Sequence, residues 1–185
     1  GGRRLAVALA TPATRLAAAA RALACERGDL LPEAWLQGLH SVGQGLHSVG
    51  SYMATDLTRL IPNKVVKSFD SFGFISSNAN DHGWENTFVR WLETTSMLDE
   101  PETTLVYGMS CSGNSKNVIK ALEYAHTTLK FNTFLFSGRK SKLKPEYVEE
   151  LCLDANYYHT VEVFALMMFY DIVHKIGETC PEINR

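Results

Sequence analysis

The sequence predicts a three-layer α/β fold, in which a parallel sheet lies between two layers of helices. From residue 63 onward, short strand-like segments alternate with helix-like segments, and this order is typical of parallel sheets. Residues 104–109 are largely apolar, as expected of a strand that helices cover on both faces. The chain has 185 residues, of which 45% are hydrophobic and 21% are charged, so we expect one domain with a sizeable core.

Each element after residue 63 has its own signature. Short segments rich in β-branched or apolar residues predict strands at residues 65–68, 104–109, 131–136 and 151–154. Longer periodic segments predict helices at residues 84–92, 114–129 and 158–178. The second helix has one apolar face, formed by Val118, Leu122, Ala125 and Leu129. The third is apolar almost all round its middle, so we expect it to be buried or to lie at a subunit interface.

Residues 1–47 differ in composition from the rest, and we interpret them as an atypical helical segment before a domain at residues 48–185. No Lys, Asn, Ile or Phe occurs in residues 1–60, and ten of the first 25 residues are alanine. Alanine is the best helix former, so we expect a helix over residues 13–25. A foreign origin of the segment is a second interpretation, and its Arg-rich, acid-poor start also resembles an organellar transit peptide.

A tandem repeat of seven residues lies where the two parts meet. The sequence QGLHSVG occurs at residues 37–43 and again at residues 44–50. Two copies of so short a unit do not build a solenoid, and a local duplication accounts for them. We therefore interpret His40 and His47 as copies of one another rather than as a pair of metal ligands.

Charge and cysteine spacing argue against several kinds of partner. The formal net charge is −2, so the sequence gives no reason to expect nucleic acid or an anionic membrane as a partner. No apolar run approaches the ~20 residues that a membrane-spanning helix needs. The four cysteines are widely separated and form no CxxC motif, and a reducing, cytoplasmic compartment fits them best.

The candidate binding site is the corner between the strand at residues 104–109 and the helix that follows. Ser110, Ser112 and Ser115 bring three hydroxyls to this corner, and Gly113 allows a close approach to the backbone. Helix N-termini at the carboxyl ends of parallel strands are suited to phosphate. A Walker A motif and a G-x-S-x-G motif are both incomplete here. From these residues alone, a phosphate site and a simple serine-rich helix cap are equally good interpretations.

Three motifs resemble the sugar isomerase (SIS) domain family, and within it the phosphoheptose isomerases. Residues 109–122, MSCSGNSKNVIKAL, resemble the phosphate loop of that family. Residues 80–85, NDHGWE, with Phe88 and Arg90, resemble a second motif, and residues 54–57, ATDL, resemble part of the first helix. The resemblance covers roughly residues 48–178 and implies a flavodoxin-like arrangement of sheet and helices.

The resemblance also implies a ligand, a reaction and an assembly. Its phosphate-binding positions are Ser110, Cys111, Ser112, Asn114 and Ser115 in this sequence, and Asp81 falls at a further substrate position. Family members interconvert a ketose and an aldose through an enediol, and this chemistry needs groups that remove and return a proton. A phosphorylated sugar and a homotetramer are the expected partners.

The catalytic positions of the family are occupied differently in this chain. Asp56 stands where the family has glutamate, and Glu162 is the one matching polar residue in the last helix. Both are candidate catalytic residues, although a structural hydrogen bond is an equally good role for Glu162. Phe164 and Phe169 stand at the two histidine positions. Some members hold zinc there, but phenylalanine cannot ligate a metal, so we expect neither zinc nor another cofactor.

Two functions therefore remain open from the sequence. The first is a phosphosugar isomerase of the phosphoheptose type with altered catalytic groups. The second is a non-catalytic SIS module that acts as a sugar-phosphate sensor or as a protein-interaction unit. Turnover of sedoheptulose 7-phosphate distinguishes the two.

Overall fold

A computed structural model describes residues 38–43, 46–60 and 65–175, all of which belong to one compact unit, Leu31–Arg185. Within these residues, five strands form one parallel sheet in the order β2-β1-β3-β4-β5. The strands are β1 (Gly38–Gly43), β2 (Val65–Ser68), β3 (Thr104–Ser110), β4 (Asn132–Ser137) and β5 (Glu149–Cys152). The chain order reverses between β1 and β3, which makes the carboxyl ends of these two strands the expected place for a ligand.

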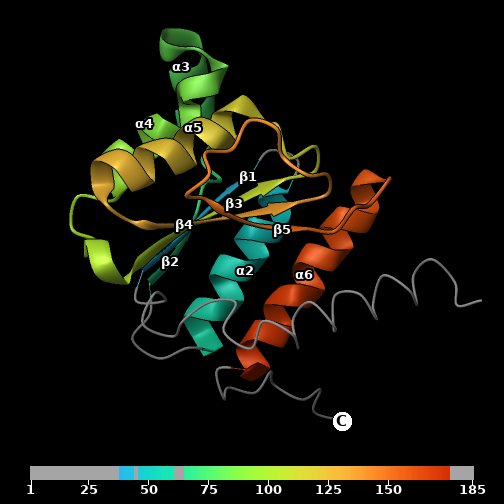
Figure 1. Cartoon of the computed structure of the whole chain (residues 1–185). Helices are drawn as coiled ribbons and strands as arrows, with labels where there is room; N and C mark the ends of the chain where they lie inside the picture. The colour runs from blue at the N-terminus through green and yellow to red at the C-terminus, as the bar shows by residue number, and fades with distance from the viewer. Residues whose placement is uncertain (1–37, 44–45, 61–64, 176–185) are drawn as a thin grey trace, which may run out of the picture. The chain divides into compact units, whose positions relative to one another are not determined.

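Helices cover both faces of the sheet (Figure 1). The helices α2 (His47–Leu60) and α6 (Tyr158–Lys175) lie side by side on one face. The other face carries α4 (Thr87–Thr95) and α5 (Lys116–Tyr124), with α3 (Phe72–His82) packed outside them. The short turns are η2 (Trp84–Asn86), η3 (Pro101–Thr103) and the π-helical η4 (Ala125–Leu129). None of the described helices is long and apolar enough to cross a membrane.

Alternate side chains of β3 build the core on both sides of the sheet. Val106 packs with Leu92 and Leu122 under α4 and α5, and Tyr107 on the opposite face meets the ring of Phe169 on α6. Each such buried side chain contributes roughly 1.5–3 kcal/mol to folding. Gly108 lets α5 approach, because a Cβ there would lie 2.9 Å from the Leu122 side chain. β3 is thus fixed from both faces, and the loop after it starts from a rigid position.

The predicted α/β fold is confirmed, and the four predicted strands and three predicted helices are present. β2 has the predicted bounds, and the other strands have shifted ends. β5 lies two residues earlier than the predicted strand at residues 151–154. The predicted helix at residues 114–129 is α5 followed by η4, and the one at residues 84–92 is η2 followed by α4. The predicted last helix is α6, of which residues 176–178 lie outside the described residues.

β1 and the extent of α2, which lie in or beside the tandem repeat, are not predicted from the sequence. The composition of the sequence places residues 38–43 in the N-terminal helical segment, yet they form the strand between β2 and β3, ahead of the predicted domain start at residue 48. The second copy of the same heptapeptide ends as the first turn of α2. Because the two copies have the same residues, the local sequence cannot indicate which copy forms a strand and which enters a helix. The position of each copy in the fold decides this. The helix expected at residues 13–25 lies outside the described residues.

Helix α3 was missed for a different reason. Phe74 and Ile75 pack against the core while only partly buried, and none of its residues is fully buried, so its sequence carries no continuous apolar stripe that would indicate a helix. Ser71 starts the helix by accepting a hydrogen bond from the Phe74 N–H, and the Gly83 N–H closes it on the Ala79 carbonyl. Local capping, rather than packing, sets the bounds of this helix.

Candidate phosphate-binding site

The candidate site lies at the carboxyl end of β3, in residues 110–115, which we call the serine loop. Ser110 is the last residue of β3, and Ser115 is the N-cap of α5. The Ser115 side chain makes no capping hydrogen bond to the helix backbone. The first turn of α5 therefore presents N–H groups that its own cap residue does not satisfy, at the positive end of the helix dipole.

Three hydroxyls of the serine loop converge on one point. The Ser110 Oγ is 2.9 Å from the Ser115 Oγ and 3.4 Å from the Ser112 Oγ. The Ser115 N–H donates to the Ser110 Oγ at 3.4 Å, and the Asn114 N–H donates to the Ser112 Oγ at 3.2 Å. Because a hydroxyl can rotate to suit its partner, the three can turn their O–H donors towards one anion.

A neighbouring loop, residues 138–142, packs tightly on the serine loop through two glycines. Gly113 has a φ of +70°, and a Cβ there would lie 2.1 Å from the Arg139 carbonyl oxygen. A Cβ on Gly138 would lie 2.5 Å from the Cys111 carbonyl oxygen. The Lys142 N–H also donates to the Asn114 Oδ1 at 2.8 Å. The two loops therefore form one rigid unit, in which Asn114 acts as a bridge.

A hollow of about 180 Å³ opens beside the serine loop. Its lining residues come from the serine loop, from the loop after β4, from the loop between β5 and α6, and from the start of α6: Cys111, Ser112, Arg139, Ala155, Asn156, Tyr157, Tyr158 and Val161. The lining combines hydroxyls, one guanidinium and two tyrosine rings. This combination suits a ligand with both an anionic and a carbohydrate part.

Glu162 on α6 acts on the serine loop through its charge, although it is not among the residues that line the hollow. Burial raises the pKa of the Cys111 thiol, and the negative charge of Glu162 raises it further. Cys111 therefore stays protonated near neutral pH and offers a weak S–H donor rather than a thiolate nucleophile.

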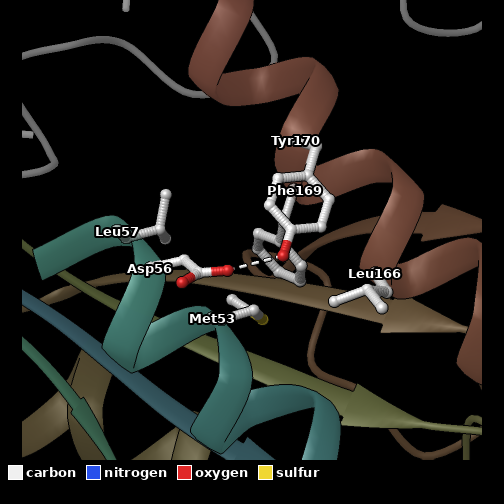
Figure 2. Close-up of a pocket in the computed structure, with 6 residues that line it drawn as sticks. All are labelled: Met53, Asp56, Leu57, Leu166, Phe169 and Tyr170. Atoms are coloured by element: carbon white, nitrogen blue, oxygen red, sulfur yellow. Dashed lines mark hydrogen bonds between the residues drawn. The ribbon is translucent and has the colours of Figure 1, made fainter. Parts of the chain in front are cut away.

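Asp56 lies in a different place, between α2 and α6 (Figure 2). Its Oδ2 accepts a hydrogen bond from the Tyr170 hydroxyl at 2.5 Å, and its Oδ1 is 3.7 Å from the Arg59 Nη1. The hollow beside it is about 10 Å³ and is lined mainly by apolar groups, so it has room for about one water molecule and none for a sugar. Tyr170 follows Glu162 by eight residues, or about 12 Å along α6. The hollow beside Asp56 and the hollow beside the serine loop have no lining residue in common.

Asp81 also lies apart from the serine loop. It is exposed in the last turn of α3 and accepts a hydrogen bond from the Asn80 amide at 2.9 Å. None of the residues that line the hollow beside the serine loop comes from α3.

The residues at the family's zinc positions do not fit a metal in this chain. Phe164 and Phe169 are buried in the apolar core, and the Asp56 carboxylate is engaged by Tyr170. One carboxylate without an imidazole is not a zinc donor set. In the described part of the chain, no three His, Cys, Asp or Glu side chains gather closely enough to hold a metal ion.

Sequence reasoning missed Arg139 and the two tyrosines that line the hollow. Arg139 follows β4 by two residues, so a search of all strand ends for charged residues could have found it. Tyr157 and Tyr158 reach the site only because α6 begins there, and this depends on how α6 packs on the sheet.

Comparison with curated proteins finds phosphoheptose isomerases. A stretch of 72 residues is 39% identical to the phosphoheptose isomerase of one Helicobacter pylori strain and 43% identical to that of strain P12. The stretch covers 38% of this chain and 35% of each relative, so the match spans about a third of the length of these curated relatives. No protein-family model matches the chain.

Solved structures of the same fold include two phosphoheptose isomerases. The one from Neisseria gonorrhoeae has a TM-score of 0.74 at 18% identity, over 88% of this chain and 91% of its own. The one from Francisella tularensis has a TM-score of 0.60 at 16% identity, over 91% and 86%. Vibrio vulnificus NanR, complexed with ManNAc-6P, has a TM-score of 0.51 at 17% identity, over 88% and 60%. The resemblance to SIS-domain phosphoheptose isomerases, inferred from three motifs, is confirmed.

Proposed function

We propose that this chain binds a phosphorylated sugar, with the phosphate at the serine loop. The observation that carries the proposal is the convergence of the Ser110, Ser112 and Ser115 hydroxyls at the start of α5. Hydroxyl donors and the positive end of a helix dipole suit a phosphate. Relatives named as phosphoheptose isomerases, and a similar fold that holds ManNAc-6P, support a sugar phosphate as the ligand.

The reaction proposed for this site is ketose–aldose isomerisation of a phosphoheptose-type sugar. The enediol of this reaction forms at C1 and C2 of the sugar, and in sedoheptulose 7-phosphate these carbons lie at the end opposite to the phosphate, so the base must lie beyond the serine loop. Glu162 on α6 is the candidate for that base, because it lies outside the serine loop and its charge acts on the Cys111 thiol within that loop. Asp56 is hydrogen-bonded to Tyr170 and lies beside a hollow too small for a sugar, so it is the weaker of the two candidates.

A second candidate function is sugar-phosphate binding without turnover. The observation that favours it is the burial of Phe164 and Phe169 at the positions where the family carries histidines. Phenylalanine cannot transfer a proton, whereas the phosphate-binding hydroxyls are retained. We favour the isomerase because the relatives that match in sequence are named for that activity.

The assembly and location proposed for the chain are a homotetramer in the cytoplasm. Exposed apolar side chains on α6, Val163 and Met167, support a subunit interface on that helix. Cys111 and Cys152 are free thiols, which suits a reducing compartment.

The proposed ligand is tested by calorimetry with sedoheptulose 7-phosphate. The double variant Ser110→Ala/Ser112→Ala removes two hydroxyl donors, each worth about 1.5–3 kcal/mol when the acceptor is charged. We expect the affinity to fall at least about tenfold. The control is Ser76→Ala, which removes an exposed hydroxyl on α3 that bonds only the Gly73 carbonyl. Equal affinity of the wild type and the double variant would contradict the proposal.

A further inference from the structure

Arg139 supplies a positive charge beside the serine loop. It is the one basic side chain among the residues that line the hollow containing Cys111 and Ser112. The serine loop itself contains no charged residue, so its hydroxyls and helix dipole meet a phosphate with partial charges only. A phosphate monoester carries about 1.5–2 negative charges at pH 7, and a guanidinium is its best-matched protein partner.

The backbone of Arg139 is held against the serine loop. Its carbonyl oxygen occupies the space left by the missing side chain of Gly113. Two residues later, the Ser141 N–H donates to the Glu150 Oε1 at 2.8 Å, and the Ser137 hydroxyl donates to the same oxygen at 2.6 Å. Glu150 on β5 therefore holds both ends of residues 137–141 to the sheet. The starting point of the Arg139 side chain is thereby fixed relative to Ser112.

The Arg139 guanidinium is held by hydrogen bonds that a phosphate ligand can replace. Its Nη1 donates to the Asp154 Oδ1 at 2.7 Å, and its Nη2 donates to the Asn156 Oδ1. The Asp154 side chain is 84% exposed and that of Arg139 is 51% exposed. An ion pair this exposed to water is worth at most about 1 kcal/mol. A phosphate that accepts two parallel N–H bonds from the guanidinium is the stronger partner.

We propose that Arg139 is the cationic phosphate-binding residue of this site, and that Asp154 and Asn156 hold its guanidinium at the rim until the ligand arrives. The inference rests on the proposed sugar-phosphate function and assigns the residue that sets the affinity for the phosphate group. Asp154 then acts as a competitor of the ligand for the same guanidinium.

The test compares variants of the full chain in calorimetric titrations with inorganic phosphate and with sedoheptulose 7-phosphate. Arg139→Gln is expected to weaken both ligands roughly 10- to 100-fold. Arg139→Lys keeps the positive charge but loses the paired N–H donors of the guanidinium, so its affinity should lie between those of the wild type and Arg139→Gln. Asp154→Asn releases the guanidinium and is expected to tighten both ligands roughly two- to five-fold. Lys140→Gln is the matched control, because it removes the same charge one residue away and does not line the hollow.

The outcomes separate this inference from the proposed function. Arg139→Gln binding as tightly as the wild type, while Ser110→Ala/Ser112→Ala binds weakly, would overturn the role of Arg139 and leave the serine loop in place. A wild type that binds neither ligand would overturn both. Circular dichroism melts establish that each variant is folded. If Asp154→Asn weakens binding as much as Arg139→Gln, the pair has only a structural role and the inference is wrong.

Discussion

His40 in β1 is a buried histidine held by one carboxylate. It is 1% exposed, and its Nε2 lies 2.6 Å from the Asp99 Oδ2, which also lies 3.0 Å from the Lys67 Nζ. Trp91 and Phe131 contact the ring, and the buried Nδ1 has no hydrogen-bond partner among the described residues. Burial lowers the pKa of His40 below 6.5, and although Asp99 acts in the opposite direction, burial prevails. The imidazole is therefore neutral at pH 7.

Stability should fall as the pH decreases through the pKa of the folded His40. The unfolded chain binds a proton on this residue near pH 6.5, whereas the folded chain resists it to a lower pH. The contribution of the neutral imidazole is complete above pH 6.5 and is lost below that value. Asp99 titrates outside this window, because its burial is outweighed by hydrogen bonds from His40 and Lys67 and its pKa lies below 3.8.

Urea unfolding between pH 7.5 and pH 5 measures this effect. His40→Gln keeps a polar side chain that does not titrate. We expect the free energy of unfolding of the wild type to fall more steeply with decreasing pH than that of the variant. Parallel slopes for the two proteins would show that His40 does not carry the pH dependence.

At the scale of elements, the sequence predicts well those segments that are buried and those sites whose residues are adjacent in the chain. β3 and α5 could be predicted because every residue of β3 is buried and α5 has one clear apolar face. The serine loop could be predicted because its hydroxyls are adjacent in the sequence. Arg139 could be found only by a search of all strand ends for charged residues. Asp56 could not be placed, because its surroundings depend on how α2 and α6 pack together, which local residues do not determine.

Helix α6 limits the expected rate of isomerisation. Phe164 and Phe169 remove the imidazoles that would shuttle a proton, and proton transfer by a positioned group typically contributes about 10²–10⁴-fold. We expect sedoheptulose 7-phosphate turnover to be slower than that of ordinary enzymes by about that factor, and Glu162→Gln to remove what remains. A coupled assay measures both. Turnover near the ~10 s⁻¹ typical of enzymes, abolished by Asp56→Asn, would contradict this expectation.

At the scale of the whole molecule, α6 presents an apolar surface outward. Val163 is 60% exposed and Met167, one turn later on the same side of the helix, is 53% exposed. Exposed apolar side chains that lie next to one another on one helix face can form part of a subunit interface. We expect a symmetric oligomer, in agreement with the proposed homotetramer.

Light scattering at micromolar concentration checks the assembly. Val163→Asp/Met167→Asp is expected to shift the protein towards smaller species, because burying two carboxylates in an interface is costly. Phe72→Asp on α3 serves as the control, since this ring is exposed on the opposite side of the sheet. A monomeric wild type would refute the expectation.

The two copies of QGLHSVG offer two chemically identical segments that could each form the strand between β2 and β3. A slip of seven residues would place the second copy between β2 and β3 with every side chain of β1 reproduced, so strand pairing alone leaves the two registers degenerate. In the slipped register, His47–Gly50 would join the strand, and α2 would lose its first turn. The close approach of Gly50 to the Ser41 side chain would also be lost. With identical copies, the choice between the registers is therefore made by the helix, and substitutions in α2 should change the kinetic partitioning between them even though they leave the pairing of β1 unaltered.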